Sequence, residues 1–80
     1  MPIIEQISEV FERELGVTAD EFDIDLRYGD LPEWDSMTHM NIVVALEVRF
    51  AITFNSEEIP GLSSIRAIES ALRRKGVVDE

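Results

Sequence analysis

The run from Ser36 to about Phe50, SMTHMNIVVALEVRF, constrains the fold most, because it is apolar on two sides. At the roughly 100° per residue of an α-helix, five residues share the face that we expect to meet the core: His39, Ile42, Val43, Leu46 and Phe50. Four others form an outer stripe roughly opposite: Met37, Met40, Val44 and Val48. A surface helix needs only one apolar stripe, so the outer one must either be covered by the chain or bind something else.

Two amphipathic helices are predicted on either side of this run. Apolar residues recur at helical spacing over residues 3–15, and Gly16 follows as a C-terminal stop. Ser63 or Ser64 begins the last helix, which Gly76 ends.

A shorter helix is predicted between these, at about residues 56–60. Ser56 is placed to cap it, and Pro60 and Gly61 keep it short. The preceding AITFNS is too brief for a strand and has no evident pairing partner.

Residues 17–35 are rich in turn formers, yet apolar residues are spaced among them. These anchors predict an ordered loop packed over the helices: Val17, Phe22, Ile24, Leu26, Tyr28 and Leu31. We therefore expect an all-α, four-helix bundle of three main helices and one short one. It would be a single domain over residues 1–80, with an ordered core at about 3–76.

The charge of the chain restricts its partners. The net charge is −10, which makes nucleic acid an unfavourable ligand and favours partners with basic patches. Eleven acidic residues and two arginines give residues 1–35 a net charge of −9. The chain has no cysteine, leader or membrane-length apolar run, so we expect a soluble, cytoplasmic monomer without a disulfide or a membrane partner.

Ser36 is the residue in this acidic chain that most invites a chemical role. As a nucleophile it would have His39 one helical turn away, but a glycine-flanked elbow and an oxyanion hole are lacking. A calcium loop over DIDLRYGDLPEW fails at Arg27, Tyr28 and Trp34, and we expect no metal site. Two roles stay open for Ser36: a helix N-cap, for which Asp35 is equally suited, and an attachment point for a phosphodiester at the positive end of the helix.

The segment EWDSMTHMNIVVALEVRFAITF resembles the central region of acyl carrier proteins. In that family an Asp-Ser-Leu motif opens the second helix, and here Asp35, Ser36 and Met37 match it with methionine in place of leucine. VALEVRF matches the family's Ala-Leu-Glu run followed by phenylalanine, and DLPEWDS matches its approach to the serine. The order of helices also matches over essentially the whole chain.

The resemblance implies a non-catalytic carrier. Ser36 would hold a covalent 4′-phosphopantetheine arm, donated by coenzyme A, and acyl or aminoacyl groups would ride on its thiol as thioesters. The implied partners are a phosphopantetheinyl transferase and acyl-loading and acyl-processing enzymes with basic or apolar docking patches. Partner recognition is expected from residues around and beyond the serine: Trp34, Asp35, Met37, Met40, Val44, Glu47 and Val48. Helical phase suggests an acyl pocket lined by Val43, Leu46, Ile59 and Leu62.

The chain departs from housekeeping fatty-acid carriers on the outer side of the second helix. Thr38, Asn41, Val48 and Arg49 stand where acids are common in that branch. We therefore expect a specialised carrier for a lipid, polyketide or other secondary-metabolite pathway. A D-alanyl carrier stays open, whereas a peptidyl carrier is disfavoured because the Gly-Gly-His-Ser approach is absent. The alternative is an unmodified interaction module that docks through the outer stripe.

Overall fold

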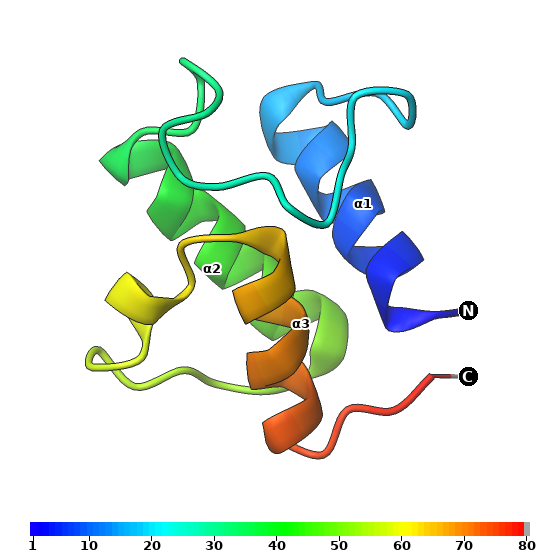
Figure 1. The fold of residues 1–80 in the computed structure, drawn as a ribbon. Helices are drawn as coiled ribbons and strands as arrows, with labels where there is room; N and C mark the ends of the chain where they lie inside the picture. The colour runs from blue at the N-terminus through cyan, green and yellow to red at the C-terminus, as the bar shows by residue number, and fades with distance from the viewer. Residues whose placement is uncertain (80) are drawn as a thin grey trace.

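The computed structural model describes residues 1–79, and within them the chain forms an all-helical bundle. Its elements are α1 (Ile3–Leu15), α2 (Ser36–Phe50), the 3₁₀ helix η1 (Ile59–Gly61) and α3 (Ile65–Arg74). The two ends of the chain lie side by side (Figure 1), where the Ile3 N–H donates to the Asp79 carboxylate at 2.8 Å. The predicted all-α class and the order of the helices are confirmed.

The main helices begin and end as local chemistry requires. Gly16 follows α1 in the left-handed region at φ 73°, and its N–H donates to the Glu12 carbonyl. Ser64 caps α3, because its side chain accepts from the Ala67 N–H at 3.0 Å. Ala51 ends α2 at φ 54°, a conformation that disfavours a side chain with a Cβ.

The short helix begins later than predicted. Residues 56–58 form turns, and η1 occupies Ile59–Gly61. The Asn55 N–H donates to the Glu58 carboxylate and the Glu58 N–H donates to the Asn55 carbonyl, so this reciprocal turn takes the place of a helix capped by Ser56. The Lys75 ammonium donates to the Glu58 carboxylate at 3.0 Å and lies over the Phe54 ring, which fixes the turn to the end of α3.

The loop over residues 17–35 is ordered, as predicted, because it is bonded to the start of α3. The Ile65 and Arg66 N–H groups donate to loop carbonyls of Leu26 and Ile24, both at 3.0 Å, and the Tyr28 N–H donates to the Ser63 carbonyl at 2.7 Å. The loop thereby satisfies helix N–H groups that lack a partner within α3. All its predicted apolar anchors are buried or half-buried except Tyr28, which is exposed.

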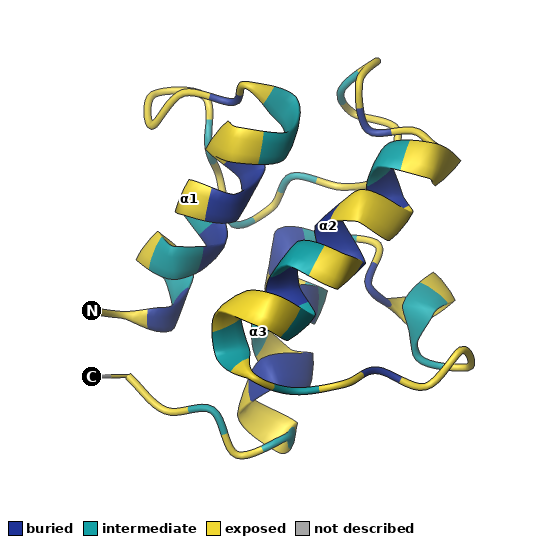
Figure 2. Ribbon diagram, turned by 180° about the vertical axis from the view of Figure 1, so that it is seen from behind, coloured by how far each residue is buried: buried dark blue, intermediate teal, exposed yellow. Residues whose placement is uncertain are grey.

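The core lies between the three α-helices and the loop, and exposed residues run along the outward sides of α1 and α2 (Figure 2). Trp34 is a core residue that the sequence pattern did not identify, and only 1% of its surface is exposed. Its ring meets Phe11 of α1 edge-to-face, with 5.0 Å between ring centroids. The segment before α2 is therefore anchored in the core rather than held only at the surface.

The strained end of α2 generates the first prediction. Replacing Ala51 by glycine should raise the free energy of unfolding by roughly 0.5–1 kcal/mol, because glycine adopts positive φ without a Cβ clash. Ala45→Gly, in the middle of the same helix, should lower it by about 1 kcal/mol. Urea unfolding followed by circular dichroism measures both, and a destabilised Ala51→Gly variant would contradict this view of the helix end.

Candidate functional site

Ser36 is the first residue of α2 and is exposed. The N-cap is Asp35, whose carboxylate accepts from the Thr38 N–H at 2.9 Å, while its carbonyl accepts from the His39 N–H at 2.8 Å. The prediction that Ser36 itself caps the helix is therefore wrong, and the alternative cap, Asp35, is the one used. Because Asp35 performs the capping, the Ser36 hydroxyl is left to face solvent.

The carboxylate of Asp35 is held in its charged form. Hydrogen bonds from the Thr38 backbone and hydroxyl lower the pKa of Asp35 below its ordinary value. A negative charge thus stands beside Ser36 at neutral pH. It belongs to the helix cap and also offers a basic partner an ion-pair acceptor.

His39 is not placed to activate Ser36. Its Nδ1 accepts from the Trp34 indole N–H at 3.0 Å, and its Nε2 lies 3.2 Å from the Ile59 carbonyl oxygen. An acceptor at Nδ1 places the ring proton on Nε2, which therefore donates to Ile59. Both ring nitrogens are engaged by other groups, so the arrangement lacks a free base for Ser36. The interpretation of His39 as a packing residue is supported by its burial.

A cavity of about 350 Å³ opens beside Ser36, on the side of α2 that faces η1. We call it the Ser36 cavity, and it is lined by Tyr28, Ser36, His39, Met40, Ile59, Pro60 and Ser63. Of the four predicted acyl-pocket residues, only Ile59 lines it. Val43, Leu46 and Leu62 are at most 2% exposed and belong to the packed core, because the α2 face that carries them points at the other helices. That these three residues line an acyl pocket stays a prediction.

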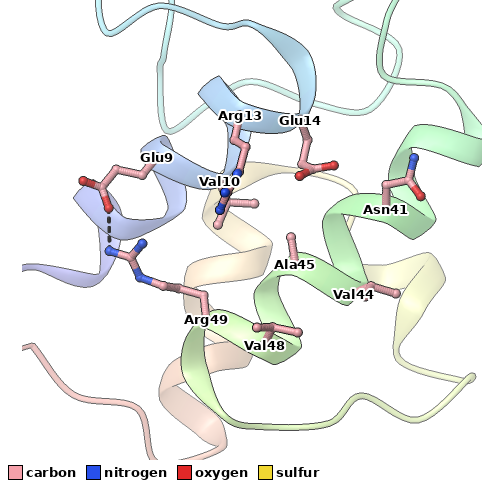
Figure 3. A pocket seen from close by; sticks show the side chains of 9 residues that line it. All are labelled: Glu9, Val10, Arg13, Glu14, Asn41, Val44, Ala45, Val48 and Arg49. Atoms are coloured by element: carbon pink, nitrogen blue, oxygen red, sulfur yellow. Dashed lines mark hydrogen bonds and ion pairs between the residues drawn. The ribbon is translucent and has the colours of Figure 1, made fainter.

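The outer stripe is exposed, and the alternative in which another part of the chain covers it, such as the 17–35 loop, is wrong. Met37 and Val48 keep more than three-quarters of their surface exposed, Val44 54% and Met40 45%. Met40 lines the Ser36 cavity, whereas Val44 and Val48 line a second hollow of about 640 Å³ between α1 and α2, the α1/α2 groove (Figure 3). The stripe is thus a ridge between two depressions.

Two residues that we expected to contact partners, Trp34 and Glu47, make contacts within the protein itself. Trp34 is buried, so its side chain is not available on the surface. Glu47 is half-buried, and its carboxylate accepts from the Phe54 N–H at 2.8 Å, which ties the end of α2 to the following segment. Neither burial nor this hydrogen bond can be recognised from a motif match.

Comparison with known proteins now adds to this geometry. A family model described as a phosphopantetheine attachment site matches residues 5–72, well over half of the chain. The chain belongs to the phosphopantetheine-attachment family. A curated relative, the acyl carrier protein of Petrotoga mobilis (strain DSM 10674 / SJ95), is 24% identical over 78 residues, covering 98% of this chain and 92% of the relative. The resemblance to acyl carrier proteins is thereby confirmed.

Family membership makes this chain a carrier with covalently attached 4′-phosphopantetheine, and not an enzyme. A phosphopantetheinyl transferase and the enzymes that process the cargo are the partners of such a carrier. The residues at the start of α2 fit the group, because an exposed hydroxyl, the N–H groups of a first helical turn and an apolar cavity meet there. The group itself supplies the thiol that the cysteine-free chain lacks.

Over residues 1–79, no group of three or more histidine, cysteine, aspartate or glutamate side chains is arranged to hold a metal ion. Among the helices of that part of the chain, none has the length and apolar character needed to cross a membrane.

The Asp35 cap generates a prediction for pH dependence. Because its pKa is lower in the folded chain than in the unfolded one, its contribution to stability is complete above the unfolded pKa of about 3.9 and is lost as pH falls through the folded pKa. The melting temperature of the wild type should therefore exceed that of Asp35→Ala at pH 6, and the difference should shrink steadily toward pH 2. Other carboxylates titrate in both proteins, so a pH-independent difference would contradict the capping role of the charge.

Proposed function

We propose that Ser36 carries the 4′-phosphopantetheine and that the protein holds acyl or aminoacyl intermediates on it as thioesters. The observation that carries this proposal is the exposed Ser36 hydroxyl at the start of α2, freed from capping by Asp35 and placed at the mouth of an apolar cavity. An arm attached there starts outside the packed core. Its far end is free to reach a partner enzyme, and its cargo can return to the cavity.

The proposed attachment is a phosphoryl-transfer step. Ser36 Oγ attacks the phosphorus of coenzyme A that bears the pantetheine, and a new O–P bond forms. The bond from that phosphorus to adenosine 3′,5′-bisphosphate breaks, and its electron pair leaves with the nucleotide. The hydroxyl proton passes to a base of the transferase, because His39 is engaged with Trp34 and Ile59.

We further propose that partners recognise the ridge formed by Met37, Met40, Val44 and Val48. These side chains are exposed on one helix, and exposed methionine and valine provide an adaptable apolar contact. The acidic residues lie mainly in α1 and the loop, so they attract basic partners at long range while the apolar ridge makes the close contact. This division differs from an acidic recognition helix and favours a specialised lipid, polyketide or other secondary-metabolite pathway.

Attachment at Ser36 is tested by intact mass. Incubation with coenzyme A and a broad-specificity phosphopantetheinyl transferase should add one 4′-phosphopantetheine to the wild type and none to Ser36→Ala. Ser63→Ala is the matched control, because Ser63 is also exposed and lines the same cavity. It should be modified at the wild-type rate. An unmodified wild type beside a modified control carrier would instead support the interaction module without an arm.

Docking through the ridge is tested by the double variant Met37→Gln/Val44→Thr. Both residues are exposed, so stability should change by less than about 0.5 kcal/mol, whereas kcat/KM for the transferase should fall about tenfold. Val78→Thr makes a similar change on an exposed valine near the C-terminus and should leave kcat/KM unchanged. Unchanged kinetics in the double variant would overturn the docking surface.

The proposal of a specialised pathway has its own test. Equal acceptance of the wild type and a housekeeping carrier by fatty-acid elongation enzymes would count against the specialised pathway.

A further inference from the structure

The inner wall of the Ser36 cavity is formed at the point where His39 of α2 meets η1. His39 and Ile59 both line the cavity, and they are joined by the 3.2 Å contact between Nε2 and the Ile59 carbonyl oxygen. At about 350 Å³, the cavity lies near the lower end of the range of about 300–1,000 Å³ found for small-molecule sites. It therefore has room for a small acyl group beside Ser36.

The packed core lies next to this wall. Val43 and Leu46 lie one and two turns after His39 on the core-facing side of α2, and Leu62 directly follows η1. All three are at most 2% exposed, so a chain that moved past His39 would have to displace side chains that are already close-packed. Three of the four residues that we expected to line an acyl pocket thus lie behind the wall of the Ser36 cavity, and the fourth, Ile59, is part of that wall.

His39 is held in place from two sides. On one side the Trp34 indole N–H donates to Nδ1, with the two ring planes 27° apart, and on another the Tyr28 ring meets the imidazole edge-to-face. Trp34 itself is fixed in the core. Because the Trp34 N–H requires an acceptor at Nδ1, the proton of the neutral ring stays on Nε2, where it bonds to η1.

We propose that the His39–Ile59 hydrogen bond is a latch between α2 and η1 that sets the cargo of this carrier. With the bond intact, the Ser36 cavity shelters a short apolar acyl group on the arm. A longer chain enters between α2 and η1 only when the bond breaks and η1 moves away from His39. His39 is thus a specificity-determining residue and not a catalytic one. This inference rests on the proposed attachment of the arm at Ser36.

The test uses the full chain loaded at Ser36 with acyl groups from acetyl to dodecanoyl, confirmed by intact mass. Methyl NMR signals report the cavity through Ile59 and the core through Leu46 and Leu62, and the His39 Nε2–H signal reports the latch. Butyryl should shift the Ile59 signal and leave the two leucine signals at their positions in the unloaded arm-bearing protein. Dodecanoyl should shift the Leu46 and Leu62 methyl signals, and the same sample should lose the His39 Nε2–H signal.

A variant that lacks the latch hydrogen bond provides a second, independent test. His39→Phe keeps a ring but removes both hydrogen bonds, and it should protect dodecanoyl thioester from hydroxylamine about tenfold better than the wild type does. His39→Gln, whose amide can donate to Ile59, should stay close to the wild type. Should His39→Phe not fold, the wild-type signals alone decide the matter.

Three outcomes would overturn the latch. They are leucine shifts while the Nε2–H signal persists, an Ile59 signal that no acyl group moves, and equal protection in the wild type and a folded His39→Phe. Each is read on protein that already carries a loaded arm. Failure of the attachment at Ser36 is seen earlier, as a missing mass adduct, and is therefore distinct from failure of the latch.

Discussion

The hydrogen bond from the Trp34 indole to His39 is the interaction on which the arrangement around Ser36 depends. Trp34 is buried against Phe11 of α1, and His39 passes the connection on to Ile59 of η1. Three segments far apart in the chain are thus joined near the start of α2. Removing a large buried aromatic side chain typically lowers the free energy of unfolding by about 3–5 kcal/mol, which is a large part of the stability of a small domain. Ser36 stands two residues after Trp34, so the buried tryptophan fixes the backbone position of the exposed serine.

Two neighbouring residues divide two roles: Asp35 caps α2, and Ser36 presents an exposed hydroxyl. Asp35 turns inward along the helix end to accept from Thr38, and the next residue is left to face solvent. A serine that capped the helix would engage its own oxygen with a backbone N–H. The Asp-Ser pair therefore combines a fixed helix start with a free hydroxyl, and the two requirements do not compete for one side chain.

The sequence was informative where a feature depends on periodicity or on local chemistry. The bounds of α1 and α2 follow from apolar spacing, Gly16 and a capping residue, and the structure agrees with them. The role of Trp34 was not predictable in this way, because a tryptophan among Pro, Glu and Asp looks exposed until its tertiary contact with Phe11 is known. Helical phase placed Val43 and Leu46 on the correct face of α2, but it cannot say whether that face meets a cavity or packed side chains. The later start of η1 likewise depends on the Asn55–Glu58 turn and on its contact with Lys75, a residue distant in sequence.

The position of α2 explains how one short helix can serve two purposes. Its inner face supplies the core, and its outer face separates the Ser36 cavity from the α1/α2 groove. Along the groove the Arg49 guanidinium pairs with Glu9, so α1 and α2 are joined there by charge as well as by apolar contact.

A partner seated on the ridge would touch Met37 beside the proposed arm and Val48 three turns further along, and both lie on one rigid element. Because the proposed contact surface and the proposed attachment serine share a helix, recognition of the ridge would also set the direction in which the partner meets the arm. In the docking mode that we propose, the acids of α1 and the loop would act on approach, over the roughly 8 Å screening length of physiological salt, and apolar side chains would make the close contact.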